Sequence, residues 1–310
     1  MKDVNGTVTP SLRLGIDLGG SKIAGIALAP GGAIVAQHRM ASPRHDYAAT
    51  LRAIGDTVAR LETTAGARGT VGIGMPGSLV PGSGLVQNAN STWLNGRPFG
   101  RDLEAHLERA VRLANDANCF ALSEAIDGAG AGAPSVFGVI LGTGCGGGLV
   151  FQGALIDGPL GIGGEWGHNP LPWAGPDEHP GPQCWCGRLG CMEAWVSGPA
   201  LEADHTRATG ERLTCDAVAA RAAGGDAAAA ATLARHASRL ARGLAHVVNI
   251  FDPHVVVLGG GLSNLAHLYE VLPDLIAAHL FAARPGIALR QPRWGDASGV
   301  RGAAWLWGRP

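Results

Sequence analysis

The chain has 310 residues, of which 46% are hydrophobic, and a formal net charge of −1 at pH 7. This length and apolar content predict a globular protein large enough for two lobes with separate cores. The charge balance gives no electrostatic reason for a nucleic-acid or membrane partner, and no apolar run approaches the roughly 18 residues of a membrane span. The polar start of the chain lacks the apolar centre of a signal peptide, so we expect a cytoplasmic protein.

Hydrophobic periodicity predicts alternating strands and helices. The first half of the chain is expected to form two strands around a glycine turn at 12–28, strands at 33–39, 70–75 and 111–114, and helices at 47–64, 101–107 and 119–132. The second half is expected to form strands at 136–141, 148–151 and 255–258, and helices at 216–250, 265–281 and 300–307. The pattern of strand, glycine turn and strand occurs twice, near Gly19 and near Gly144, which indicates a weak internal duplication with a junction near 115–118.

Two glycine-rich turns are candidates for phosphate binding. The first is Asp17-Leu18-Gly19-Gly20-Ser21-Lys22, and the second is Leu141-Gly142-Thr143-Gly144-Cys145-Gly146-Gly147-Gly148. Glycine allows backbone N–H groups to approach phosphate oxygens closely, and a carboxylate such as that of Asp17 can hold water on Mg²⁺. Neither turn has the spacing of a Walker A loop, and plain hairpin turns are the alternative. Their joint occurrence favours phosphate binding.

A third turn, Gly259-Gly260-Gly261, follows a predicted strand and precedes a helix for which Ser263 is the expected cap. A nucleobase or ribose can lie flat on such a bare backbone, and a helix N-terminus favours an anionic phosphate. Taken alone, this turn is not specific for any ligand.

Polar residues follow the strand predicted at 111–114. Asp116 is suited to accept the proton of an attacking hydroxyl in a phosphoryl transfer, and Asn115 can hydrogen-bond to sugar hydroxyls. In isolation this pair fits a helix N-cap better. The polar loop at 88–95 adds Asn90 as a candidate sugar contact.

Three close-set cysteines and one histidine make a complete tetrahedral ligand set for one Zn²⁺ ion: His168, Cys184, Cys186 and Cys191. Four protein ligands leave no open coordination position, so the metal is expected to be structural. Glu165 and Glu193 stand beside these ligands in sequence and are candidate sugar-binding carboxylates. The alternatives are free thiols in a loop and solvated surface charges.

These motifs, in this order, resemble those of the ROK sugar kinases (repressor, open reading frame, kinase) over residues 12–307. The most specific match is C-x-C-G-x-x-G-C-x-E after E-x-G-H, and the main departures are Ser21, where threonine is commoner, and the segment 174–183. The resemblance implies an α/β fold of the two-lobe actin/hexokinase-like (ribonuclease H-like) ATPase type with a structural zinc loop. Residues 1–117, with 298–310 packing back on them, would form the small lobe, and 118–297 the large lobe.

The resemblance also implies roles for residues of this sequence. Asp116 would be the catalytic base, and His168 would serve both zinc and sugar. The implied sugar contacts are Asn90, Asn115, Asp116, Glu165, His168 and Glu193. The implied nucleotide contacts are Asp17, Gly19, Gly20, Ser21, Lys22, Thr143, Gly144, Gly259, Gly260 and Gly261. ATP, Mg²⁺, a structural Zn²⁺, a hexose and a second copy of the chain would be the partners.

Within the family, three segments resemble bacterial fructokinases of the mannofructokinase type: 88–96, 142–146 and 165–173. N-acetylglucosamine kinases usually carry phenylalanine in place of Trp166 and a different loop in place of Ser91-Thr92-Trp93. The expectation is therefore ATP-dependent phosphorylation of the 6-hydroxyl of fructose, and also of mannose. An N-acetylglucosamine kinase or a glucokinase is the alternative within the family. A sugar-responsive regulator without catalysis is the alternative from another class, although only a short polar stretch precedes residue 12.

Overall fold

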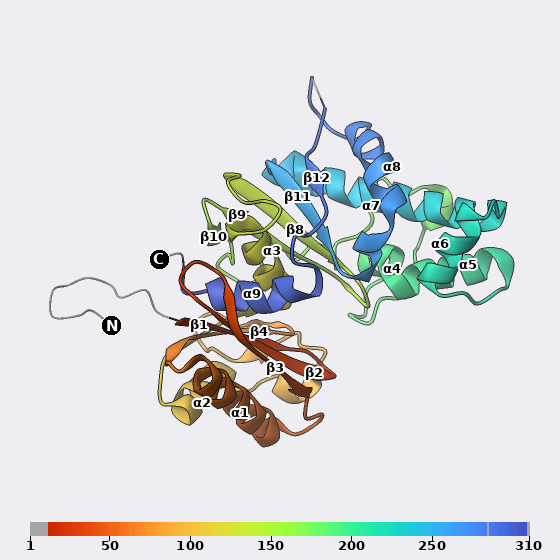
Figure 1. Ribbon diagram of the computed structural model, residues 1–310. Helices are drawn as coiled ribbons and strands as arrows, with labels where there is room; N and C mark the ends of the chain where they lie inside the picture. Colours follow the sequence, from red (N-terminus) through yellow and green to blue (C-terminus); the bar gives the residue numbers. More distant parts are fainter. Residues whose placement is uncertain (1–11, 284, 309–310) are drawn as a thin grey trace.

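The computed structural model describes residues 12–283 and 285–308, which form two five-stranded sheets and one two-stranded ribbon (Figure 1). The first sheet has the order β3-β2-β1-β4-β7. Its strands are β1 (Leu12–Leu18), β2 (Lys22–Leu28), β3 (Ile34–Ala41), β4 (Gly69–Met75) and β7 (Val111–Asn115). Strand β1 is antiparallel to β2 and parallel to β4, which is parallel to β7. The carboxyl ends of β1, β4 and β7 therefore meet at one edge of the sheet.

Two helices cover the outer face of this sheet, namely α1 (Tyr47–Ala65) and α2 (Phe99–Leu107). The Asp46 side chain caps α1 by accepting a hydrogen bond from the Ala49 N–H, and the helix ends at Gly66 in the left-handed conformation (φ 68°). Its residues Ile54, Val58 and Leu61 recur at helical spacing and are buried against the sheet. The short strands β5 (Ser78–Leu79) and β6 (Val86–Gln87) form the separate ribbon beyond β4.

The second sheet has the order β10-β9-β8-β11-β12 and repeats the hairpin-plus-parallel pattern of the first sheet. Its strands are β8 (Ser135–Leu141), β9 (Cys145–Phe151), β10 (Ala154–Leu155), β11 (Val255–Gly259) and β12 (Leu289–Arg290). Alternate residues of β8 point to opposite faces. Phe137 and Val139 pack on one face with the helices of the second half of the chain, and Val136 packs on the other face with α3 (Asp116–Ile126). The helices on the first face are α4 (Glu193–Val196), α5 (Gly198–Thr209), α6 (Cys215–Ala223), α7 (Ala227–Phe251) and α8 (Ala266–Ala277).

Helix α9 (Ser298–Trp305) returns the chain to the first sheet and lies beside α3 between the two sheets (Figure 1). A Cβ atom on Gly302 would lie 1.6 Å from the Cys119 carbonyl oxygen, and one on Gly15 would lie 2.0 Å from the Val300 carbonyl oxygen. Neither position has room for a side chain. Glycine at both positions therefore allows α9 to contact β1 and α3 at backbone distance.

The observed α/β architecture confirms the predicted fold class, but several predicted boundaries are wrong. The helix expected at 119–132 is α3, which begins earlier at Asp116 and ends at Ile126. The strand expected at 148–151 begins at Cys145, and the helix expected at 265–281 covers only Ala266–Ala277. The helix expected at 216–250 is two helices, because the chain breaks at Gly224 and Gly225 (φ 92°).

Other differences are local. Helix α5 and strand β12 were not predicted. Ser263 does not cap α8, because its hydroxyl donates to the Gly260 carbonyl within a 3₁₀ turn (Gly261–Asn264), and α8 begins after Leu265 without a side-chain cap. The polar stretch 1–11 lies outside the described residues. No helix among those described is long and apolar enough to cross a membrane.

Candidate active site

The junction of β7 and α3 carries the predicted base. Strand β7 ends at Asn115 and α3 begins at Asp116, so both side chains lie at the carboxyl edge of the first sheet. The Asn115 side-chain oxygen accepts a hydrogen bond from the Ala117 N–H at 2.9 Å, and its amide donates to the Gly77 carbonyl at 3.0 Å. Asn115 is therefore the helix cap that the sequence suggested, which leaves Asp116 as a separate carboxylate beside it.

Residues from both halves of the chain surround a cavity of about 290 Å³. The first half contributes its side chains from β7–α3 and from the loop that carries Asn88 and Asn90, and the second half contributes the turn between β8 and β9. Most of the predicted sugar and phosphate contacts meet here: Asn90, Asn115, Asp116, Thr143, Gly144, Glu165, His168 and Glu193. These residues are far apart in sequence, so their convergence indicates a binding site.

Three carboxylates line this cavity, those of Asp116, Glu165 and Glu193, and burial raises the pKa of the first two. Burial raises the pKa of Asp116, against hydrogen bonds from backbone N–H groups that lower it. Burial also raises the pKa of Glu165, against the lowering effect of His168, and the charges of Glu193 and Asp116 raise it further. A carboxylate with a raised pKa is a stronger base, which suits Asp116 to accept a proton.

The carboxylate of Glu193 is held from two sides. One oxygen accepts the Cys145 backbone N–H at 3.0 Å, and the other accepts the indole N–H of Trp185 at 2.5 Å. A Cβ atom on Gly144 would lie 2.7 Å from the Glu193 carboxylate, so the glycine is needed for this approach. The turn after β8 and the cysteine-rich loop are thereby joined through one acidic side chain.

The predicted metal ligands are adjacent in space. The ligand atoms of His168, Cys184, Cys186 and Cys191 all lie within 4.8 Å of one another. Isolated bridges between Pro170 and Cys191 and between Gln183 and Leu189 bring the segments of this loop together. Three thiols and one imidazole at this separation have the donor chemistry that zinc requires, so the residues fit a structural zinc site.

The first phosphate loop forms the tight turn between β1 and β2, closed by a hydrogen bond from the Gly19 N–H to the Lys22 carbonyl at 3.0 Å. Asp17 and Lys22 line a neighbouring cavity of about 660 Å³, whereas Gly19, Gly20 and Ser21 line neither this cavity nor the one around Asp116. Burial, followed by the charge of Asp116, raises the pKa of Asp17 to about 6. Asp17 is therefore close enough to Asp116 for the charge of Asp116 to affect its pKa.

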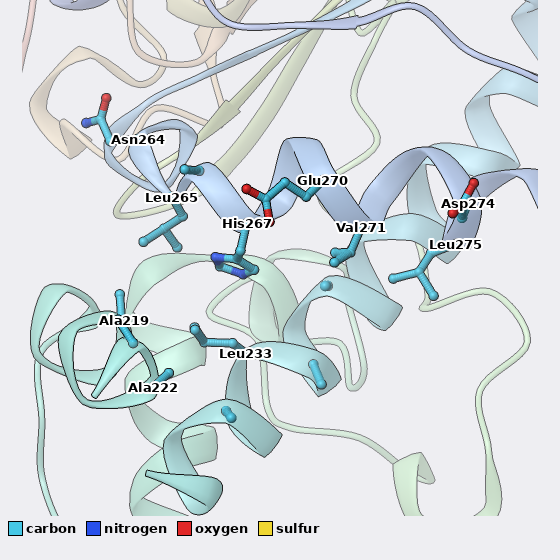
Figure 2. Close-up of a pocket in the computed structure, with 15 residues that line it drawn as sticks. Ala219, Ala222, Leu233, Asn264, Leu265, His267, Glu270, Val271, Asp274 and Leu275 are labelled. Carbon is cyan, nitrogen blue, oxygen red and sulfur yellow. The ribbon is translucent and has the colours of Figure 1, made fainter. Parts of the chain in front are cut away.

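The third glycine turn connects β11 to the 3₁₀ turn before α8. Gly260 has a φ of 78°, and a Cβ atom there would lie 2.3 Å from the Leu141 carbonyl oxygen, so no other residue fits without rearrangement. Beyond the turn, from Asn264 onward, a largely apolar cavity of about 900 Å³ lies between α6, α7 and α8 (Figure 2). Figure 2 shows His267 on α8 pointing into it toward Leu233 and Ala222. The Nε2 atom of His267 is buried without a hydrogen-bond partner.

A side cavity of about 530 Å³ shares Gly77, Asn88, Asn115, Gly147, Glu165, His168 and Trp185 with the cavity around Asp116. Its further walls include Ser78, Asn118 and Arg188. Sequence reasoning missed Trp185 and Asn88 as site residues, although both stood inside motifs that had been singled out. The position of Trp185 between the ligands Cys184 and Cys186 was the available signal.

Two tryptophans that suggested the subtype lie outside these cavities. Trp93 donates its indole N–H to the Thr50 hydroxyl and packs with the core of the first sheet. Trp166 is 4% exposed and donates its N–H to the Gly146 carbonyl on β9. Neither residue lines the cavity around Asp116 or the side cavity.

Comparison with known proteins bears on this arrangement. A curated relative from Pasteurella multocida, named N-acetyl-D-glucosamine kinase, is 38% identical over 300 residues, covering 95% of this chain and 99% of the relative. The solved ROK hexokinase from Thermus thermophilus is 34% identical, with a TM-score of 0.84 over 94% of this chain and 96% of that chain. The solved ROK family glucokinase from Streptomyces griseus, in complex with glucose and AMPPNP, is 29% identical, with a TM-score of 0.75 over 95% and 98%.

A profile of the ROK family matches residues 13–309, which is nearly the whole chain and includes every residue of the cavity described above. The resemblance expected from the motifs is confirmed at the level of the family, while the fructokinase subtype is not. The relative at 38% identity carries the name of a different sugar kinase, and two of the residues that suggested the subtype, Trp93 and Trp166, line neither cavity. By its sequence, its fold and the residues gathered around Asp116, the chain belongs to the ROK family.

Proposed function

We propose that this protein transfers the γ-phosphoryl group of ATP to the 6-hydroxyl of a hexose, and that N-acetyl-D-glucosamine is its preferred substrate. The observation that carries the proposal is the cavity that Asp116, Glu165, His168 and Glu193 line together with the glycine turn at 142–147. Carboxylates and an imidazole suit the binding of sugar hydroxyls, and a glycine turn suits the binding of phosphate oxygens.

In the proposed reaction, Asp116 accepts the proton of the 6-hydroxyl as that oxygen bonds to the γ-phosphorus and the bond to the β-phosphate oxygen breaks, giving ADP and the hexose 6-phosphate. Backbone N–H groups of the turn around Thr143 and Gly144 would face the transferred phosphoryl group. Asp17 and Lys22 would lie on its other side, with Asp17 holding water on the Mg²⁺ of the nucleotide. Asn90 and Asn115 would complete the sugar contacts.

The nucleotide base is proposed to lie in the apolar cavity of Figure 2, with the ribose over the turn at Gly259, Gly260 and Gly261. An apolar cavity with few polar groups is the usual surrounding of an aromatic ligand. The unpartnered Nε2 of His267 would then gain a hydrogen bond from, or to, the base. Loss of ATP preference over other nucleoside triphosphates in His267→Ala would support this placement.

His168, Cys184, Cys186 and Cys191 would hold a structural Zn²⁺, which supplies rigidity to the loop and takes no part in the transfer. Residues 1–117 with 298–310 are proposed as one lobe and residues 118–297 as the other, with the cavity at their junction. A homodimer, as the family resemblance implies, remains part of the proposal and is tested by light scattering.

N-acetyl-D-glucosamine is favoured over fructose for two reasons. The side cavity offers room beside the proposed sugar position for a substituent larger than a hydroxyl, and the relative at 38% identity bears the name of that kinase. Two of the residues that suggested fructose, Trp93 and Trp166, line neither cavity. Glucose is the second candidate, because the solved glucokinase shares the fold over nearly the whole chain.

The test is an assay of ADP release with ATP, Mg²⁺ and five sugars: N-acetyl-D-glucosamine, glucose, fructose, mannose and N-acetylmannosamine. The highest kcat/KM for N-acetyl-D-glucosamine would support the proposal. The highest kcat/KM for fructose would overturn it and support the fructokinase that the sequence motifs predicted. If zinc-loaded protein binds a sugar but releases no ADP with any of them, the kinase proposal fails and a sugar-responsive regulator takes its place.

A further inference from the structure

Trp185 has an unusual combination of contacts and exposure. Trp185 is 64% exposed, which is more than any other tryptophan in the described part of the chain. Its indole nevertheless makes two specific contacts, an edge-on packing against His168 with ring centroids 5.0 Å apart and a hydrogen bond to Glu193 at 2.5 Å. A large aromatic surface is therefore held rigidly in place while it remains open to solvent.

The indole also stands where the two cavities meet, because Trp185 lines both the cavity around Asp116 and the side cavity. Its N–H and the Cys145 N–H each occupy one oxygen of Glu193. An ionised carboxylate has about four acceptor positions, so two remain for hydroxyl groups of a ligand. Trp185 thus fixes the direction of Glu193 without using up its capacity to accept hydrogen bonds.

We propose that Trp185 is a positioning residue for the hexose: its N–H aims the Glu193 carboxylate at the sugar, and its exposed ring becomes the wall that the bound sugar covers. This inference rests on the proposed function, since it takes the cavity around Asp116 as the sugar site. The ring closes the side of the site toward the side cavity, so it also limits which ring substituents can enter that space.

The first experiment uses the intact zinc-loaded protein and iodide quenching of tryptophan fluorescence. An exposed indole is accessible to iodide, and a sugar that covers it removes this access. N-acetyl-D-glucosamine or glucose is therefore expected to protect part of the emission, and Trp185→Phe is expected to abolish the protected part. Trp173→Phe is the matched control, because Trp173 is also exposed (54%) but stacks on His279 and lines neither cavity.

The second experiment separates positioning from general structural damage. Trp185→Phe keeps an aromatic ring but removes the N–H, and loss of one hydrogen bond to a partly exposed carboxylate is expected to raise the sugar KM by about three- to tenfold. Trp185→Ala removes the ring as well and is expected to raise it further. The KM for ATP, kcat and the zinc content are expected to stay within about twofold, since the interaction is made equally in the bound and transition states.

The outcomes separate this inference from the proposed function. Unchanged sugar KM in Trp185→Phe, or sugar protection that persists at full size in that variant, would overturn the role of Trp185 while leaving the kinase intact. Parallel loss of kcat, ATP affinity and zinc in Trp185→Phe would show a structural role and would also overturn it. Sugar protection that requires Trp185, in a protein that transfers no phosphate, would refute the kinase and retain Trp185 as a sugar-site residue.

Discussion

The ion pairs of Glu178 are expected to stabilise the segment between His168 and Cys184. Glu178 accepts hydrogen bonds from Arg239 at 2.9 Å and from both terminal nitrogens of Arg242 at 2.7 and 2.8 Å. The three side chains are 14%, 8% and 9% exposed, respectively. Arg239 also pairs with Asp204, and Arg242 donates to the Trp173 carbonyl, so the network fastens the segment around Glu178 to α5 and α7.

Removing the charge by Glu178→Gln leaves two nearly buried arginines without their shared partner. Loss of one member of a buried ion pair costs about 3–5 kcal/mol, and the contacts retained by the arginines reduce the expected loss to about 2–3 kcal/mol. The shift in the pKa of Glu178 leads to a similar expected loss of stability. Burial would raise this pKa, but hydrogen bonds from Arg242, the Gly175 N–H and Arg239 lower it to about 2. About two pKa units correspond to roughly 3 kcal/mol, which solvent screening at the loop surface reduces toward 2 kcal/mol.

The sign of the pH dependence follows from this shift. Because the folded pKa lies below the unfolded value of about 4.3, the contribution of Glu178 is fully present above that value and is lost as pH falls toward 2. Urea unfolding of zinc-loaded protein at pH 7 and at low pH measures it. The gap between wild type and Glu178→Gln is expected to shrink as the pH falls, because wild-type Glu178 becomes protonated too.

Glu211→Gln is the matched control for this experiment. Glu211 makes a two-pronged ion pair with Arg221 at 2.6 Å, but both side chains are about half exposed (46% and 44%). An exposed pair of this kind contributes about 0–1 kcal/mol. If Glu178→Gln destabilised the protein no more than Glu211→Gln does, or by an amount independent of pH, the reasoning from burial and shared partners would be refuted.

Three further predictions concern the site itself. Asp116→Asn is expected to lower turnover by roughly 10²–10⁴-fold while sugar protection of the fluorescence persists, and near-wild-type ADP release would remove Asp116 from the reaction. The pKa of about 6 for Asp17 predicts that kcat/KM falls as the pH drops below about 6, where its carboxylate becomes protonated. Added Mg²⁺ should shift this acidic decline of kcat/KM to lower pH, because the metal favours the ionised carboxylate. A decline that does not respond to Mg²⁺ would contradict the role of Asp17. Cys186→Ser should reduce the zinc bound per chain and lower the Tm, whereas Cys215→Ser, outside the cluster, should leave the zinc content unchanged.

The sequence was informative where a function depends on local spacing. The three cysteines of the candidate metal site lie within one short loop, and the fold brings their sulfur atoms within 4.8 Å of a ligand nitrogen of His168, as their spacing led us to expect. Glycine turns were recognisable because backbone approach excludes side chains, as the 2.3 Å separation at Gly260 illustrates. The convergence of Asp116 with Glu165 and Glu193 followed only from the family resemblance, since no short spacing relates residues so far apart in the sequence.

Helix boundaries were less predictable because the high helix propensity of alanine competes with the backbone freedom of glycine, which can end a helix. The alanine-rich segment after Cys215 has high helix propensity throughout, yet Gly224 and Gly225 end one helix before Asp226 caps the next. Helix α3 starts at Asp116 because Asn115 caps it, an alternative that the sequence had offered but that the predicted boundary at 119 ignored. Trp185 was missed because its hydrogen bond to Glu193 depends on how the metal loop folds back on α4.

The expected subtype depended in part on Trp166, and the geometry shows how this residue relates to the cavity around Asp116. Trp166 supports the cavity from behind, since its N–H binds the Gly146 carbonyl and its ring packs on Phe137. A phenylalanine there would keep the apolar packing and replace no side chain that lines either cavity. The side cavity is lined instead by loop residues such as Asn88, which follows β6, and Arg188, which precedes α4. We therefore expect the hexose preference to depend on such loop residues more than on Trp93 or Trp166, which line neither cavity.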